Sequence, residues 1–112
     1  MRPHPLAALA MLLTASALTP LALAQGQNAA AQEALYARSL AASCANCHGT
    51  AGRAVQGSTV PALAGLDKAY IVAQMNAFKT GARPATVMHQ ISKGYNDAQI
   101  ESLASYFAAQ KK

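Results

Sequence analysis

The residues best suited to chemistry in this sequence form one short motif, Cys44-Ala45-Asn46-Cys47-His48. Its C-x-x-C-H pattern is the attachment signal for c-type haem. Positions i, i+3 and i+4 share one face of a helical turn, so Cys44 and Cys47 can each form a thioether to a haem vinyl group. His48, on the same face, then directs its imidazole at the iron. The motif predicts one covalently attached haem c per chain, with His48 as the proximal iron ligand.

Two other uses of these cysteines fit the sequence poorly. A thioredoxin-like C-x-x-C motif needs a strand, a turn and a helix around it, and the sequence has no alternating strand pattern of useful length. A zinc site needs four suitable ligands, and only His48 and His89 could join the two cysteines. Haem is the favoured interpretation, and a haemless thiol or zinc protein is the alternative.

The sixth iron ligand is expected to be Met88. A thioether favours ferrous iron and raises the potential, whereas an open position allows O₂ or peroxide chemistry. Met75 falls on a helical apolar stripe and is expected to be a core residue. Met88 lies 40 residues after His48 in a segment without helical signals, where the backbone can bring its sulfur over the haem. The adjacent His89, or an open iron position, is the alternative.

The first 24 residues have the pattern of a secretory signal peptide. They contain a basic start, an apolar run and small residues at the cleavage positions, namely Arg2 and His4, residues 6–18, and Ala22-Leu23-Ala24. We expect cleavage before Gln25, export to the periplasm and a mature domain over residues 25–112. The alternative is an uncleaved membrane anchor, but the apolar run is short against the roughly 20 residues that a span needs. No membrane span is expected after cleavage.

The composition indicates that a cofactor fills part of the core. The chain has 112 residues and a formal net charge of +5, with 12% charged and 5% aromatic residues. These values exclude a multidomain enzyme, a collagen-like repeat and a highly charged disordered chain. Residues 25–112 contain only 16 Val, Ile, Leu, Met and Phe residues, which is little for a small domain to bury. Because two cysteines cannot build a disulfide framework, a bulky cofactor is expected instead.

The residue patterns predict an all-α fold with three clear helices, a short fourth at most, and two long glycine-rich loops. The three helices are expected to begin at Asn28, Asp67 and Asn96, each of which can cap a first turn. The first should end near residue 42 and the second at Gly81. Apolar stripes mark the second and third helices, namely Ile71, Met75 and Phe78, and Ile100, Leu103, Ala104 and Phe107. The loops, residues 49–65 and 83–94, are long enough to wrap around a ligand.

Together these features resemble class I cytochrome c over nearly all of the expected mature chain. Within that family the sequence is most similar to the single-haem cytochrome subunit of flavocytochrome c sulfide dehydrogenase and related periplasmic cytochromes. The stretches that carry the resemblance are residues 44–49, 61–66, 77–88, 91–95 and 103–107. The resemblance implies helices wrapped around one haem, with His48 as the proximal and Met88 as the distal ligand.

The resemblance also implies a role for Pro61. It matches the proline whose carbonyl accepts a hydrogen bond from the proximal histidine, which fixes the orientation and basicity of the ring. The alternative is an ordinary loop proline. At the position after Met88, where family members often have glycine, this sequence has His89.

The first and last helices resemble the family's crossed terminal pair. This likeness implies that Tyr106 and Phe107, on the last helix, pack towards Leu35 and Tyr36 on the first.

We expect a one-electron carrier rather than an enzyme. The four acids, Glu33, Asp67, Asp97 and Glu101, are spread along the chain, and the two aspartates are better explained as helix-start residues. No proton chemistry is therefore predicted. The alternative is a small peroxidase-like haem enzyme whose iron is open or ligated by His89.

Four basic residues, Lys68, Lys79, Arg83 and Lys93, flank the expected loops. They form a candidate basic rim that steers an acidic redox partner, and Arg83 is a candidate contact for a haem propionate. The alternative is an ordinary solvated face. We expect the electron donor to be a dehydrogenase, such as a flavoprotein sulfide dehydrogenase, and a separate protein to accept the electron downstream. Nucleic-acid binding is not expected, because the sequence has no dense basic cluster.

Overall fold

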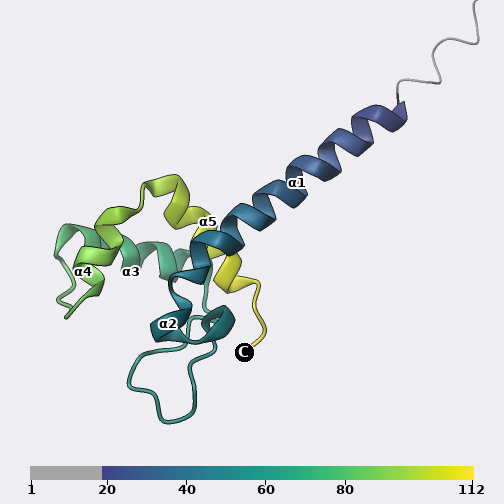
Figure 1. Cartoon of the computed structure of the whole chain (residues 1–112). Helices are drawn as coiled ribbons and strands as arrows, with labels where there is room; N and C mark the ends of the chain where they lie inside the picture. The colour runs from purple at the N-terminus through teal and green to yellow at the C-terminus, as the bar shows by residue number, and fades with distance from the viewer. Residues whose placement is uncertain (1–18) are drawn as a thin grey trace, which may run out of the picture. The chain divides into compact units, whose positions relative to one another are not determined.

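The computed structural model describes residues 19–112, so most of the predicted leader at residues 1–24 lies outside the described residues. The chain divides between Gln32 and Glu33 into two compact units, and the second, residues 33–112, contains the predicted site. The elements are α1 (Thr19–Ala42), α2 (Ala45–His48), the 3-10 turn η1 (Thr50–Gly52), α3 (Lys68–Thr80), α4 (Met88–Ile91), the 3-10 turn η2 (Ser92–Gly94) and α5 (Asp97–Ala108) (Figure 1). The described residues contain no strand, which confirms the all-α prediction.

The predicted start of the first helix at Asn28 is wrong. Helix α1 begins at Thr19, and Asn28 lies in its interior. Pro20 falls in the first turn, where the missing N–H donor costs nothing, and the Leu and Ala residues that follow favour a helix. Helix α1 therefore runs through the predicted cleavage position before Gln25.

No helix within residues 19–112 is both long enough and apolar enough to cross a membrane.

Helix α3 begins and ends as its sequence predicts. The Asp67 side chain accepts a hydrogen bond of 2.9 Å from the backbone N–H of Tyr70, which caps the first turn. At the other end, Gly81 adopts the left-handed conformation at φ 82°, a conformation that costs glycine little. These two residues fix the length of the helix that precedes residues 83–94.

Helix α5 begins with a complete capping box. The Asn96 side chain accepts from the backbone N–H of Gln99 at 2.9 Å, and the Gln99 side chain accepts from the backbone N–H of Asn96 at 3.0 Å. The two bonds satisfy backbone donors that a helix start otherwise leaves unpaired. The predicted cap and capping box are therefore confirmed.

The apolar core lies where α3, α5 and the end of α1 meet. Its buried members are Ala41, Ile71, Leu103, Ala104 and Phe107, and Met75 and Tyr106 pack against them. Ile100 is completely buried as well. The predicted stripe of α5 and the core position of Met75 are confirmed, and few of the buried side chains are large.

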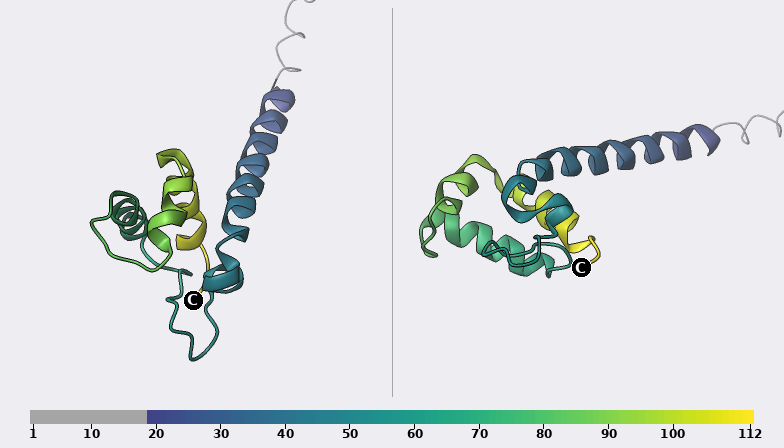
Figure 2. Two further views of the ribbon diagram at one scale, coloured as in Figure 1. Left: turned by 60° about the vertical axis from the view of Figure 1, so that its left-hand side comes forward. Right: turned by 60° about the horizontal axis from the view of Figure 1, so that its bottom comes forward.

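The predicted packing of α5 on Leu35 is wrong. Leu35 is 68% exposed, and Leu40 and Ala41, one turn or more further along, contact the core instead. Tyr36 meets α5 through a polar contact, because its hydroxyl accepts a 3.1 Å hydrogen bond from the side chain of Gln99. Both views in Figure 2 place the end of α1 beside α5. The terminal helices therefore meet, but by a different set of side chains.

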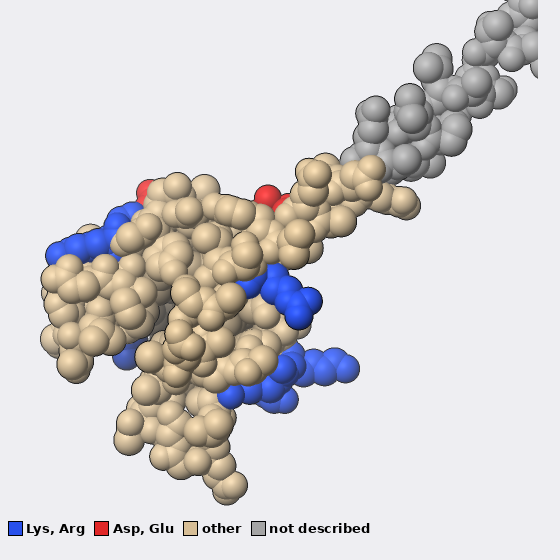
Figure 3. All heavy atoms as spheres, in the orientation of Figure 1, with Lys and Arg blue, Asp and Glu red and all other residues tan. Residues whose placement is uncertain are grey.

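Two ion pairs join α3 to α5. Lys68 pairs with Glu101 at 2.8 Å, and Lys79 pairs with Asp97 at 3.1 Å. On the face shown in Figure 3, lysine and arginine lie in separate patches and most of the surface is uncharged. Because two of the four predicted rim residues are paired with acids inside the fold, the free charge of that rim is carried by Arg83 and Lys93.

Candidate haem site

Helix α2 brings the predicted haem-binding residues onto one turn. The backbone carbonyl of Cys44 accepts hydrogen bonds from the N–H groups of Cys47 and His48, at 3.2 and 2.9 Å. Cys44 is half-buried, Cys47 is exposed, and both are free cysteines. The helical turn that the motif predicts is therefore present, and it places two thiols and one imidazole on adjoining positions of one surface.

The imidazole of His48 is held by the loop that follows. The ring is buried, with 9% of the residue exposed, and its Nδ1 lies 2.7 Å from the carbonyl oxygen of Pro61. A carbonyl can only accept, so Nδ1 carries a proton and Nε2 is the ring nitrogen that could bind a metal. That is the arrangement a metal-binding histidine needs. The predicted contact partner of His48 is thus in place.

Gly52 positions the segment that carries Pro61. Its carbonyl accepts hydrogen bonds from the backbone N–H groups of Leu63 and Ala64, at 2.8 and 3.1 Å. Gly52 itself has φ 77° and is packed against α5, where an added Cβ would lie 2.8 Å from a ring carbon of Phe107. The loop predicted at residues 49–65 is therefore closed on itself and tied to the core.

The chemistry of Cys44 argues against a redox thiol. Burial raises the pKa of its thiol above the ordinary value, outweighing the lowering effect of the contact with the Ser43 hydroxyl. The reactive cysteines of thioredoxin-like proteins have lowered thiol pKa values instead. Within residues 19–112, no three His, Cys, Asp or Glu side chains lie close enough together to hold a metal ion. The structure therefore gives no support to the thiol and zinc alternatives.

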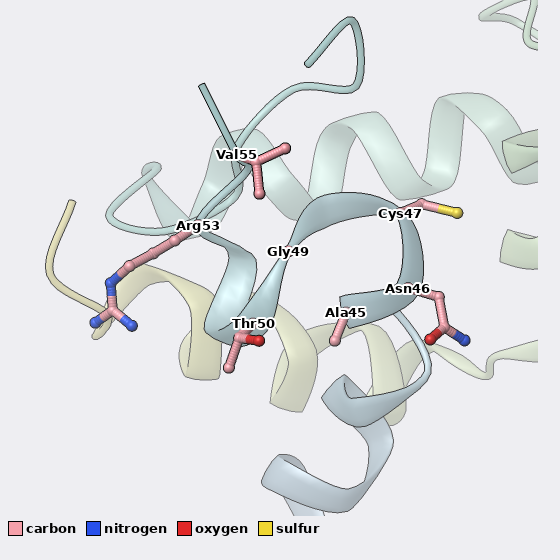
Figure 4. A pocket seen from close by; sticks show the side chains of 7 residues that line it. All are labelled: Ala45, Asn46, Cys47, Gly49, Thr50, Arg53 and Val55. Atoms are coloured by element: carbon pink, nitrogen blue, oxygen red, sulfur yellow. The ribbon is translucent and has the colours of Figure 1, made fainter. Parts of the chain in front are cut away.

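A pocket of about 460 Å³ lies against the haem-binding motif (Figure 4). Its lining residues are Ala45, Asn46, Cys47, Gly49, Thr50, Arg53 and Val55. In Figure 4 the Cys47 sulfur and the Arg53 guanidinium point in opposite directions, away from each other. The side chain of Val55 is 75% exposed. This part of the surface thus combines small and polar residues with one exposed thiol, one exposed aliphatic side chain and the Arg53 guanidinium.

Met88 lies on a separate element. It is the first residue of α4, a single helical turn, and it is half-buried. The prediction of an irregular segment over residues 83–94 is therefore wrong for its second half, which forms α4 and η2. Because one turn has no room for an apolar stripe, the sequence carried no helical signal there. The carbonyl of Met88 accepts a hydrogen bond of 2.6 Å from the hydroxyl of Ser92, which is fully buried.

Three features of the chain fit a bulky, flat, largely apolar group. The contact of the His48 Nδ1 with Pro61 leaves Nε2 as the ring nitrogen that could bind a metal. Val87 and Ile91, on either side of Met88, are large apolar side chains that are exposed. Finally, the Nδ1 of His89 is buried without a hydrogen-bond partner among the described residues, and such atoms are normally satisfied. The donor set and the exposed apolar side chains therefore fit a haem.

The predicted propionate contact, Arg83, is engaged with α3. Its guanidinium lies over the ring of Phe78, 4.7 Å from the ring centre, and also donates to the side-chain oxygen of Gln74. The stacking supplies a favourable cation–π contact. Arg83 is therefore held at the end of α3, at the start of the segment that leads to Met88.

Sequence reasoning missed the hydroxyl groups around the site. Ser43, Ser92 and Tyr95 make hydrogen bonds there. The Tyr95 hydroxyl bonds to Ser43, 52 positions earlier in the chain. Sequence patterns indicate contacts only between residues that are close in the chain, so nothing in the sequence indicated this one. Tyr95 had appeared only within a stretch of family resemblance.

Comparison with known proteins places these features in context. The family model described as Cytochrome c matches residues 33–111. The chain is 41% identical over 68 residues to the cytochrome subunit of sulfide dehydrogenase from Chlorobaculum tepidum, an alignment that covers 61% of this chain and 60% of that protein. It is 39% identical over 71 residues to the thiosulfate dehydrogenase electron acceptor of Thiomonas intermedia, covering 63% of this chain and 33% of that one.

A longer alignment relates the chain to cytochrome c4 of Pseudomonas aeruginosa. The identity is 36% over 103 residues, which is 92% of this chain and 48% of the relative. The chain thus spans less than two thirds of the length of each of these relatives.

Proposed function

Because the chain belongs to the cytochrome c family, whose members carry electrons on a covalently bound haem c, we propose that it is a periplasmic one-electron carrier with His48 and Met88 as its iron ligands. Cys44 and Cys47 are the cysteines of its C-x-x-C-H motif and would form the two thioethers. The haem supplies the ferric/ferrous couple.

One observation carries this proposal, the hydrogen bond between His48 and Pro61. The 2.7 Å contact at Nδ1 fixes the ring and leaves Nε2 free, on the same helical turn as both cysteines. A hydrogen-bonded carbonyl also raises the basicity of the ligating nitrogen. An imidazole that is buried and held in one orientation is preorganised to hold iron in both oxidation states.

The chain's own residues keep the reorganisation on electron transfer small. Pro61 prevents rotation of the proximal ring, and two thioethers would tether the porphyrin to α2. A methionine thioether is not protonated, so the distal side needs no proton when the iron changes charge. The acids around the fold are occupied elsewhere, for example Asp97 with Lys79 and Glu101 with Lys68, which agrees with simple electron transfer.

His89 is the competing distal ligand. Its Nδ1 is buried and has no hydrogen-bond partner among the described residues, which supports a role close to the cofactor. Met88, at the preceding position, matches the distal ligand that the resemblance implies. We favour Met88 because the resemblance places the distal ligand at this position and because a thioether, unlike a second imidazole, favours ferrous iron and raises the potential. A holoprotein that turns over peroxide, or whose ferric spectrum shows two histidine ligands, would contradict this choice.

We further propose that the electron donor is a dehydrogenase, such as a flavoprotein sulfide dehydrogenase. Two relatives support this proposal, because one is named as the cytochrome subunit of sulfide dehydrogenase and the other as a thiosulfate dehydrogenase electron acceptor. Arg83 and Lys93, both exposed, would form the basic contact that steers the donor, and Arg83 would also reach a propionate. A separate redox protein would accept the electron downstream.

Export is the remaining part of the proposal. Signal peptidase would cut before Gln25, within α1, and haem attachment would follow outside the cytoplasm. The mass and N-terminal sequence of the protein recovered from a periplasmic extract test this directly. We expect a chain that begins at Gln25 and carries one haem, whereas a chain that retains residues 1–24 in the membrane fraction would contradict it.

The function itself is tested by anaerobic stopped-flow mixing of the ferric holoprotein with sulfide dehydrogenase and sulfide, or with thiosulfate dehydrogenase and thiosulfate. We expect fast one-electron reduction by one of the two enzymes, slowed by added salt because surface charges steer the encounter. A protein that neither enzyme reduces would contradict the proposed donor. A titration without a one-electron wave would contradict the carrier function.

A further inference from the structure

We propose that Tyr95 is a positioning residue for the distal iron ligand, because its hydroxyl ties the Met88 segment to the residue next to Cys44. The Met88 segment is defined as residues 88–95, which comprise α4, η2 and Tyr95. This inference rests on the proposed His48/Met88 ligation and adds to it a device that keeps Met88 in place.

The bond between Tyr95 and Ser43 has a definite direction. The Tyr95 hydroxyl lies 2.9 Å from the Ser43 hydroxyl, and the single proton of Ser43 is donated to the carbonyl of Leu40 at 3.0 Å. A hydroxyl has one donor and two acceptor sites, so Tyr95 donates and Ser43 accepts. The Met88 segment is thereby anchored to Ser43, which follows the last residue of α1 and immediately precedes Cys44.

A continuous series of hydrogen bonds leads from Tyr95 to Met88. The backbone N–H of Tyr95 donates to the carbonyl of Ser92 at 3.3 Å. The Ser92 hydroxyl, which is completely buried, donates to the carbonyl of Met88 at 2.6 Å. A displacement of Tyr95 would therefore reach Met88 through one intervening residue.

The backbone of Tyr95 is held as well. Its carbonyl accepts a 2.9 Å hydrogen bond from the ammonium group of Lys79, on α3, and its side chain packs against the apolar core. Tyr95 is thus fixed on one side by α3 and on the other by Ser43. It is the residue of the Met88 segment that joins these two parts of the chain.

The Met88 segment lies against α3 on one side, and the Tyr95 hydroxyl links it to Ser43 on the other. A single helical turn does not form by itself in water, since nucleation is costly. The large apolar side chains beside Met88, Val87 and Ile91, are exposed rather than packed in the core. The hydrogen bonds to Ser43 and Lys79 therefore add to the packing against α3 in ordering the segment. Without the Tyr95 hydroxyl, the segment should release Met88 from the iron more readily.

The test is displacement of the methionine by imidazole in the ferric holoprotein, followed by loss of the far-red sulfur-to-iron band. Tyr95→Phe keeps the ring and removes only the hydroxyl. Loss of one hydrogen bond predicts that about fivefold less imidazole displaces the ligand. Ser43→Ala should produce a similar change, and the double variant should show little further change, because both substitutions remove the same bond.

Tyr36→Phe is the matched control. It removes a tyrosine hydroxyl that also makes a long-range hydrogen bond, here with Gln99 at 3.1 Å, but it does not touch the Met88 segment. We expect its imidazole titration to match the wild type within about twofold, while circular dichroism shows all variants folded. Equal shifts for Tyr36→Phe and Tyr95→Phe, or no shift for Tyr95→Phe, would overturn the positioning role.

A separate outcome addresses the ligation itself. A wild-type protein without the far-red band would overturn the His48/Met88 proposal and, with it, the role of Tyr95. A wild-type protein with the band, but without a specific effect of Tyr95→Phe, would leave the ligation intact and overturn only the positioning role.

Discussion

The ring Nδ1 of His48 lies 2.7 Å from the carbonyl oxygen of Pro61, 13 residues further along the chain. This contact decides what the histidine can do. Because a backbone carbonyl only accepts, the imidazole is held in one orientation with Nε2 available. The loop between the two residues is closed by hydrogen bonds to the Gly52 carbonyl, so the orientation of the ring depends on how that loop is held.

The first prediction concerns Gly52, which holds that loop. Gly52→Ala would place a Cβ 2.8 Å from Phe107 Cδ1 and 3.0 Å from the backbone of Ala64, at φ 77°. Gly57→Ala is the control, since its φ is 80° but nothing lies within 4 Å. We expect Gly57→Ala to lower the free energy of unfolding by about 1 kcal/mol, because of backbone strain. Gly52→Ala should lower it by about 1–3 kcal/mol more, because the added Cβ overpacks the contact with α5.

Urea unfolding of the holoproteins measures both values. Equal losses of stability for the two variants would show that the loop can move away from α5, in contradiction to the close packing at Gly52.

The second prediction concerns the cofactor as part of the core. The buried apolar residues of the described chain are Ala41, Ala64, Ile71, Ile100, Leu103, Ala104 and Phe107, so nearly half are alanines. We expect Cys44→Ala/Cys47→Ala, which cannot attach haem, to be largely unfolded, because so small an apolar core does not offset the entropy of folding. Near-ultraviolet circular dichroism is the measurement, and a native-like spectrum of the double variant would contradict the argument.

The third prediction compares the two ion pairs between α3 and α5. Lys68→Gln removes an exposed pair with Glu101 and should cost less than about 1 kcal/mol. Lys79→Gln removes the pair with Asp97 and also the donor to the Tyr95 carbonyl, and should cost about 1–2 kcal/mol. Urea unfolding at low and high salt separates them, since salt screens exposed pairs. A larger loss for Lys68→Gln would contradict this ranking.

Much of the fold follows from local patterns in the sequence. The spacing of Cys44, Cys47 and His48 predicts a helical turn, and that turn is present as α2. Asp67 and Asn96 cap helices because their short side chains reach backbone donors three residues ahead. Such features depend on residues that are close in the chain, and sequence analysis detects them for that reason.

The features that sequence analysis missed depend on distant residues or on very short elements. The start of α1 at Thr19 was missed because Asn28 is a residue type that often caps helices. In the structure Asn28 lies inside α1 instead. Helix α4 is too short to show periodicity. The exposure of Leu35 follows from how α1 meets α5, and the bond between Tyr95 and Ser43 from the path of the whole chain. None of these can be deduced from spacing alone.

The most direct test of the account is the optical spectrum of the periplasmically expressed ferric and ferrous holoprotein, recorded beside Met88→Ala. The account predicts a low-spin haem with a far-red sulfur-to-iron band that Met88→Ala abolishes, since the thioether of Met88 is the proposed distal ligand. His89→Ala is the control and should retain the band. A high-spin spectrum of the wild type, or a spectrum that changes with His89→Ala and not with Met88→Ala, would contradict the account.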